Sequence, residues 1–297
     1  MPITAQLISN LLLNNKTYGV GSTPTPFSIM KELLKFGGTL SGKKSTITGI
    51  VGGIVLLFLW WVVTYAGLIS PKILPNPIDV LKVIPNLVTE RNLFGNIWYT
   101  VRLNLLGYFY ALIIAIPLGF VIGIYPLPRA MFQKPFEAIR FLPLPVTSGI
   151  FVTIFGLGFG MKAAFLAFGI LIYILPVVTQ RVLDLQNPDN VKDNVYLQTA
   201  TTLGMTNSQK FRHVYFPYVM EKVYGDIRSL VAISYTYVTI AENINKEGGI
   251  GATINTLSRQ SDMSSVYCLL FIIILIGILQ DWIFKIFDPI IFKHHKA

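Results

Sequence analysis

Long apolar runs alternate with short polar segments along most of the chain. Runs of about 20 residues, the length that crosses a bilayer as a helix, recur from residue 48 to residue 284. They predict six transmembrane helices, over residues 48–69, 96–125, 141–159, 163–179, 223–241 and 266–284. The predicted fold class is therefore an all-α integral membrane protein.

One polar segment, YLQTATTLGMTNSQKFRHVYFP at residues 196–217, is more regular than a connector needs to be. Gly204 stands between two short helical patterns, and Pro217 closes the second pattern just before the chain becomes apolar again. Glycine favours the ends of helices, and proline interrupts their interiors. The pattern predicts a solvated helix–Gly–helix hairpin that offers a face to a soluble partner. The alternative is a hairpin that merely caps the bundle.

Composition supports the membrane assignment. Charged residues make up 13% of the chain, against about 25% in soluble domains, and the mean hydropathy is +0.60. The net charge is +10, but the basic residues lie between the apolar runs rather than in one patch, which argues against binding of nucleic acid. The positive-inside rule is best satisfied with both termini in the cytoplasm, and residues 196–217 then lie there too.

The two ends of the chain differ from the membrane domain predicted over residues 47–292. Residues 1–46 form a mixed N-terminal cytoplasmic segment without the pattern of a signal peptide. Within it, SIMKELLKF at residues 28–36 predicts a short interfacial helix. Residues 293–297 form a basic C-terminal tail.

Charged residues and prolines mark several positions in the predicted spans. Arg102 lies near the outer end of the second span, where it either snorkels to the interface or serves a function. Residues 126–139 are basic and predict a cytoplasmic loop, and Pro143 and Pro145 then indicate a kinked or broken helix. Four charged residues begin the fifth span and either lie at the interface or pair across the bundle: Glu221, Lys222, Asp226 and Arg228.

Catalytic and cofactor sites are not indicated by the sequence. Residues 37–44, GGTLSGKK, approach a phosphate-binding loop, but Lys44 replaces the Ser or Thr that would hold magnesium. Cys268 is the only cysteine, and the histidines lie outside the apolar runs. We therefore expect a conduit without catalytic, metal or cofactor residues, which receives energy from another protein. The alternatives are an ATPase-independent secondary transporter or channel, and a membrane enzyme or assembly subunit.

The spacing of the polar segment resembles a known motif. Permease subunits of ATP-binding-cassette (ABC) importers carry a loop with the pattern E-A-A, three residues, Gly, nine residues, Ile, one residue and Leu-Pro. Every spacing is kept here, with Gln198, Thr199, Ala200, Gly204, Val214, Phe216 and Pro217 at the motif positions. Gln198 stands where the family has Glu, and Thr199 stands where it has the first Ala.

Further segments, in the correct order from about residue 74 to residue 292, resemble the nitrate/sulfonate/taurine branch of that family. They are LPNPIDVL at 74–81, Arg102 with Gly107, IPLGFVIG at 116–123, IRFLPLP at 139–145 and AENINKEGGIGATI at 241–254. The resemblance suggests pathway or gating roles for residues within these segments, namely Arg102, Pro143, Pro145, Glu242, Gly249 and Gly251.

The resemblance implies a permease subunit in the inner cell membrane that works in a larger complex. Its expected partners are a second copy of the chain, a cytoplasmic ABC ATPase dimer that binds ATP and Mg, an extracytoplasmic solute-binding protein and membrane lipid. The helix after Gly204 would lie in a groove of the ATPase. The substrate is left open, because the sequence of the spans indicates neither an anion-selective pathway nor a pathway for neutral solutes.

Overall fold

A computed structural model describes residues 36–38 and 42–291, and the described residues form helices without strands. The predicted interfacial helix at residues 28–36 and the tail at 293–297 lie outside the described residues, apart from Phe36. The helices are α3 (Gly42–Tyr65), α4 (Pro77–Lys82), α5 (Ile84–Glu90), α6 (Leu93–Ile124), α7 (Pro126–Ile139), α8 (Leu144–Phe155), α9 (Phe159–Gln186), α10 (Val191–Thr202), α11 (Asn207–Lys210), the π-helix η1 (Phe211–Tyr215), α12 (Phe216–Ser229), α13 (Val231–Glu242), α14 (Ile250–Arg259) and α15 (Met263–Ile291).

The chain divides into two compact units, residues 1–59 and residues 60–297. The described part of the first unit is mostly the beginning of α3, whose most apolar stretch buries no side chain within the chain. Such an apolar and uncovered helix suits a lipid environment. Everything described below lies in the second unit.

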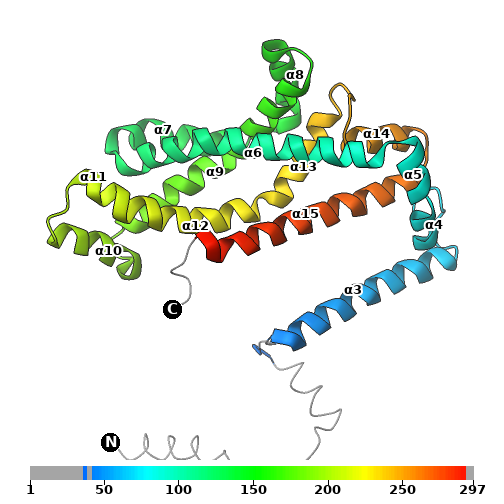
Figure 1. Cartoon of the computed structure of the whole chain (residues 1–297), viewed down its shortest axis with the longest axis horizontal. Helices are drawn as coiled ribbons and strands as arrows, with labels where there is room; N and C mark the ends of the chain where they lie inside the picture. Colours follow the sequence, from blue (N-terminus) through cyan, green and yellow to red (C-terminus); the bar gives the residue numbers. More distant parts are fainter. Residues whose placement is uncertain (1–35, 39–41, 292–297) are drawn as a thin grey trace, which may run out of the picture. The chain divides into compact units, whose positions relative to one another are not determined.

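Two long helices, α6 and α9, form the centre of the second unit and lie side by side (Figure 1). A stripe of small residues on α6 recurs at every fourth position, which keeps it on one face of the helix. A side-chain carbon added to the glycines of this stripe would lie about 2.5–2.7 Å from Leu166, Val178 or Val182 of α9. The stripe therefore lets the two backbones approach closely, as small residues do between membrane helices. Its members are Gly107, Ala111, Ala115, Gly119 and Gly123.

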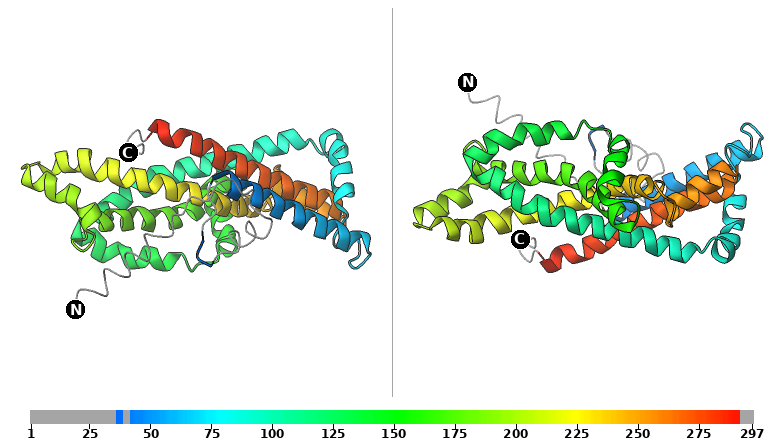
Figure 2. Two further views of the ribbon diagram at one scale, coloured as in Figure 1. Left: turned by 90° about the horizontal axis from the view of Figure 1, so that it is seen from below. Right: turned by 90° about the horizontal axis from the view of Figure 1, so that it is seen from above.

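The remaining helices pack around this pair. α12 and α13 contact α9 on one side, and α15 contacts α13 and α14. Two views at right angles to the first place α10 and α11 at one end of the unit and α4 and α5 at the opposite end (Figure 2). The ends of the bundle are thus built from different elements, a helical hairpin at one and short helices at the other.

The all-α membrane fold is confirmed, but the count of six spans is not. Among the residues that the structure describes, four helices are long and apolar enough to cross a membrane, Ser45–Tyr65, Leu93–Ile124, Phe159–Gln186 and Met263–Asp288, and α7 together with α8 would make a fifth, bent span. The third predicted span is interrupted, because α8 has 12 residues, about 18 Å of helix against the roughly 30 Å of a bilayer core. The fifth predicted span is divided at Leu230 into α12 and α13.

The prediction of a loop over residues 126–139 was wrong, because this stretch forms α7. Pro126 occupies the first turn of the helix, where a missing N–H costs nothing. α7 folds back onto α6 and α9, and the chain then turns by 108° into α8 (Figure 1). The fourth predicted span, residues 163–179, corresponds to α9, which extends beyond it in both directions.

Candidate functional site

A helical hairpin of α10 and α11 closes one end of the bundle (Figures 1 and 2). Gly204 ends α10 with a φ of +70°, the left-handed conformation that glycine adopts readily. The Gly204 N–H donates to the Thr201 carbonyl, and the Met205 N–H donates to the Ala200 carbonyl, both at 3.0 Å. This pair of bonds is a Schellman motif. No atom lies within 4 Å of a Cβ placed on Gly204, so its backbone conformation rather than crowding favours glycine there.

The second arm of the hairpin begins with a capping box. The Thr206 side chain accepts a hydrogen bond from the Gln209 N–H at 3.4 Å, and the Gln209 side chain accepts one from the Thr206 N–H at 2.8 Å. Both helix ends that face the turn are therefore stabilised by local bonds. The structure has the helix–Gly–helix arrangement predicted from the sequence.

Pro217 does not close the second helix as predicted. The chain stays helical from Asn207 to Ser229, through α11, η1 and α12, and Pro217 lies in the first turn of α12. Proline offers no N–H to the carbonyl four residues earlier and crowds it. The wider π turn just before it, in which the Phe216 N–H donates to the Phe211 carbonyl, accommodates this defect without ending the helix.

The first three motif residues differ in their surroundings. Ala200 is buried, whereas Gln198 and Thr199 are exposed. The Gln198 amide donates to Asn194 Oδ1 at 2.7 Å, and Asn194 Nδ2 donates to the Leu185 carbonyl at 3.1 Å. Gln198 thus belongs to a chain of hydrogen bonds that joins α10 to the end of α9.

Aromatic side chains connect the second arm to the central helices. Phe216 stacks on Phe120 of α6 with ring centroids 6.0 Å apart, and Phe211 meets the same ring edge-on at 5.2 Å. Phe120 is almost fully buried, and Val214 is half buried. The motif position at Phe216 is therefore a packing contact between the hairpin and the long helix α6.

Ion pairs bind α12 to three other helices. Asp226 makes two bonds of 2.8 Å to Arg181 of α9. Lys222 pairs with Asp193 of α10 at 2.8 Å, and Arg228 pairs with Asp281 of α15. Lys222, Asp226 and Arg228 thus pair across the bundle, and the position of this stretch at a membrane interface stays a prediction. Sequence patterns could not identify the partners, because they lie 29, 45 and 53 residues away.

The pKa of Asp193 reflects the contact between α10 and α12. Burial alone would raise this pKa, but hydrogen bonds from Lys222, Tyr218 and Asn190 outweigh burial and hold it below its ordinary value. A lowered carboxyl pKa contributes stability that is present at neutral pH and is lost as the pH falls through the folded-state value. The link is therefore charged and intact at neutral pH.

We expect Asp226→Ala to destabilise the protein by about 1–2 kcal/mol, between the values for surface and buried ion pairs. The reason is that the side chains of Arg181 and Asp226 are only 33% and 25% exposed. Thermal unfolding in detergent of both single alanine variants and the double variant measures the coupling. The control pair, Lys82 and Asp79, is 71% and 55% exposed and should show little coupling. Additive effects of Arg181→Ala and Asp226→Ala would contradict the prediction.

A second polar cluster lies toward the opposite end of the bundle, around the fully buried Glu242. Its carboxylate accepts hydrogen bonds from Thr100 Oγ1 and from the Gly251 N–H, both at 2.6 Å. The Gly249 N–H donates to Asn96 Oδ1 at 3.0 Å. The end of α13 is thereby bonded to α6 and to the start of α14, so three of the predicted pathway residues meet here: Glu242, Gly249 and Gly251.

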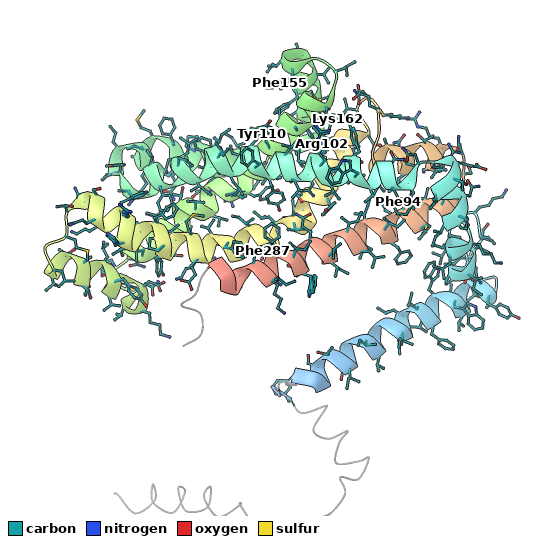
Figure 3. The ribbon with its side chains drawn as sticks, viewed as in Figure 1. Phe94, Arg102, Tyr110, Phe155, Lys162 and Phe287 are labelled. Atoms are coloured by element: carbon teal, nitrogen blue, oxygen red, sulfur yellow. The ribbon has the colours of Figure 1, made fainter. Side chains whose placement is uncertain are left out.

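The same region contains two basic side chains, labelled in Figure 3. Lys162 is fully buried, donates to the Tyr99 hydroxyl at 3.1 Å and lies 3.7 Å from Glu247. Arg102 is exposed, and its guanidinium lies 4.9 Å from the centroid of the Phe159 ring. Lys162 was not predicted from the sequence, because it follows a glycine-rich stretch and belongs to no motif. The role of Arg102 stays a prediction.

The other two predicted pathway residues, Pro143 and Pro145, flank the start of α8. They lie at the 108° bend, far along the chain from the Glu242 cluster. Within residues 36–38 and 42–291, no group of three or more His, Cys, Asp or Glu side chains is arranged to hold a metal ion.

Comparison with known sequences identifies the family. Residues 78–293 match the family described as "Binding-protein-dependent transport system inner membrane component". A probable ABC transporter permease of Brucella melitensis is 23% identical over 77% of this chain and 89% of that protein. The taurine transport system permease of Escherichia coli is 25% identical over 68% and 73%, and a putative aliphatic sulfonates transport permease of Bacillus subtilis is 20% identical over 84% and 88%.

Solved structures show the same fold. A chain of the inward-facing MetNI methionine ABC transporter superposes with a TM-score of 0.56 at 13% identity, over 68% of this chain and 99% of that chain. A second crystal form of that transporter gives a TM-score of 0.53. The chain therefore belongs to the binding-protein-dependent transport system inner membrane component family and is the membrane-spanning permease subunit of an ABC importer.

Proposed function

We propose that the α10–α11 hairpin docks on a cytoplasmic ATPase and that α12 carries its movement into the membrane helices. One observation carries the proposal: the hairpin is exposed at its tip and firmly joined at its base. Leu203, Thr206 and the motif residues Gln198 and Thr199 are exposed, while ion pairs and the Phe120 contact hold the second arm and α12. A docking element needs both properties, because force applied to its surface must reach the bundle.

The surface of the first arm offers a place for a partner side chain. An open depression is lined by Asn194, Leu197, Gln198, Thr201 and Thr202. Its polar groups are amides and hydroxyls, which donate and accept hydrogen bonds without carrying charge. Docking at this position then depends on shape and neutral hydrogen bonds, in place of the charge that the family's Glu supplies.

The complete importer would contain further chains. In this proposal, two copies of the permease enclose the pathway, the ATPase pair binds ATP and Mg, and a solute-binding protein delivers the substrate on the outer side. The end with the hairpin faces the cytoplasm, together with both termini. Relatives are named for transport of taurine, aliphatic sulfonates and formylaminopyrimidine, which supports a small organic solute as the substrate.

Gly204→Trp should abolish co-purification of ATPase activity with the tagged permease from its native membranes. The indole would occupy the tip, and the φ of +70° would strain any residue with a Cβ. Gly204→Asn is the matched control, because asparagine tolerates the left-handed conformation and adds a small side chain. Membrane insertion and detergent stability should be retained in both variants. Full ATPase recovery with Gly204→Trp would favour a hairpin that only caps the bundle.

A further inference from the structure

An apolar groove of about 430 Å³ lies between α15 and the helices α6, α12 and α13. α6 contributes Leu105 to its wall, and α15 contributes Ile276, Leu279 and Phe287, the last of which is labelled in Figure 3. The volume is within the range of ligand sites in proteins, about 300–1,000 Å³. No residue of the hairpin or of the Glu242 cluster lines the groove, so it is a separate feature of the bundle.

One polar side chain in the wall lacks a partner. Gln280 of α15 lines the groove and is only 9% exposed. Its Oε1 accepts a hydrogen bond from the Tyr235 hydroxyl at 2.6 Å, but its Nε2 is buried without a hydrogen-bond partner among the described residues. The Tyr224 hydroxyl, also in the wall, donates to the Phe284 carbonyl at 2.6 Å. Because a buried N–H without an acceptor is costly in apolar surroundings, a ligand that supplies an acceptor would stabilise the protein here.

The charge pattern of α15 indicates where Gln280 lies relative to the bilayer. The helix carries no charged residue from Met263 to Gln280. This stretch is about 27 Å long at 1.5 Å per residue, close to the roughly 30 Å of the hydrocarbon core. Asp281 follows directly, and Trp282, which is 57% exposed, is of the residue type enriched at membrane interfaces. An acceptor that meets Gln280 from the membrane therefore lies just beneath the lipid headgroups.

Glycerophospholipids have suitable acceptors at this level, because their ester carbonyls lie between the headgroup and the acyl chains. Such a carbonyl, joined to an acyl chain, matches an amide N–H beside an apolar groove. The exposed Lys285, which follows Gln280 by just over one helical turn, has no salt bridge in the described part of the chain. Asp281 is already paired with Arg228. The Lys285 ammonium is therefore available for a lipid phosphate.

We propose that the groove binds one acyl chain of a glycerophospholipid, whose ester carbonyl accepts a hydrogen bond from Gln280 Nε2 and whose phosphate lies close to Lys285. The acyl chain covers the apolar wall formed by α6 and α15, and the carbonyl satisfies the buried amide. A ligand that binds only the folded protein stabilises it by mass action. This lipid site does not depend on the docking of an ATPase at the hairpin, so each proposal can fail without the other.

Native mass spectrometry with two defined lipids tests the hydrogen bond in the full-length protein. Delipidated protein in detergent is titrated with dioleoylphosphatidylcholine or with its diether analogue, which has the same headgroup and chain length but no ester carbonyls. We expect the first lipid bound to show a preference of about fivefold for the diester, the value of one hydrogen bond. Equal binding of the two lipids to the wild-type protein would overturn the proposal.

Substitutions at Gln280 and at its neighbour identify the donor. Gln280→Leu keeps a side chain of similar size without an N–H, and it should bind the two lipids equally. Tyr235→Phe is the matched control, because it removes the other hydrogen bond of Gln280 but leaves the amide N–H in place. This variant should retain the preference for the diester. A preference that persists in Gln280→Leu would show that the ester is recognised elsewhere.

A third pair of variants tests whether the groove itself holds the lipid. Leu105→Trp fills the groove and should weaken binding of the first lipid by about tenfold. Leu275→Trp is the control, because Leu275 is 63% exposed on α15 but does not line the groove. Unchanged lipid binding in Leu105→Trp would overturn the proposal. If light scattering then also showed a loss of dimers, the groove would be covered by a second copy of the chain instead.

Discussion

Gly249→Ala should leave little folded protein, whereas Gly248→Ala at the adjacent position should be close to wild type. Gly249 has a φ of +102°, and an added Cβ would lie 2.1 Å from the Glu242 carboxyl carbon. Glu242 would have to move, although it is fully buried and receives bonds from Thr100 and Gly251. Backbone strain of about 1–2 kcal/mol and the loss of hydrogen bonds to a buried carboxylate, about 1.5–3 kcal/mol each, add in the same direction.

Gly248 is a matched control for this experiment. An added Cβ there would lie 3.3 Å from the Tyr99 ring, and its backbone is not in the left-handed region. The measurement is the yield of monodisperse protein in detergent, followed by the midpoint of thermal unfolding. Equal yields and midpoints for the two variants would show that the Glu242 cluster does not hold α13, α14 and α6 together.

Gly119→Ala should destabilise the α6–α9 pair, and Gly225→Ala should not. A Cβ on Gly119 would lie 2.6 Å from Val178, whereas nothing lies within 4 Å of one on Gly225 of α12. Overpacking costs about 1–3 kcal/mol. In an open helix position alanine instead gains up to about 1 kcal/mol over glycine. The two substitutions are chemically identical, so the sign of the change in the unfolding midpoint isolates the packing effect.

A second substitution makes the Gly119 experiment specific. Val178→Ala removes Val178 Cγ1, one of the two side-chain atoms that would lie 2.6 Å from the new methyl group, and so relieves part of the clash although Val178 Cβ remains. The double variant Gly119→Ala/Val178→Ala should therefore be more stable than Gly119→Ala alone. If Val178→Ala and Gly119→Ala destabilise additively, the two helices do not meet at this point in the folded protein.

The hairpin shows how far local sequence reasoning reaches. Gly204 at the turn and the helical patterns on both sides were read correctly, because a helix end with a left-handed glycine is a local property of a few residues. The prediction that Pro217 closes the second helix was wrong. A proline ends a helix in most contexts, but the π turn of η1 accommodates it here. Phe211 and Phe216, at the two ends of this turn, both contact Phe120, which lies on α6.

The broken third span shows a second limit. The apolar run at residues 141–159 predicted a membrane helix, and Pro143 and Pro145 indicated that this helix is kinked or broken. The direction of the chain after the break follows from contacts of Leu144 with Gly169 and of Phe151 with Phe165 on α9. A pattern along the sequence contains no information about that direction. The 108° bend between α7 and α8 was therefore not predictable from the neighbouring residues in the chain.

Local sequence patterns were enough to predict the membrane class, the long apolar helices and the hairpin with Gly204 at its turn. Each of these depends on residues within one helix length, so hydrophobic runs and helix caps are sufficient to specify them. The partners of α12, the bend between α7 and α8 and the cluster around Glu242 became visible only in the folded arrangement of the helices. The Asp226–Arg181 and Thr100–Glu242 contacts join residues 45 and 142 positions apart. Such pairs form only when the helices pack against each other, because their members are far apart along the chain. No local sequence pattern therefore identifies them.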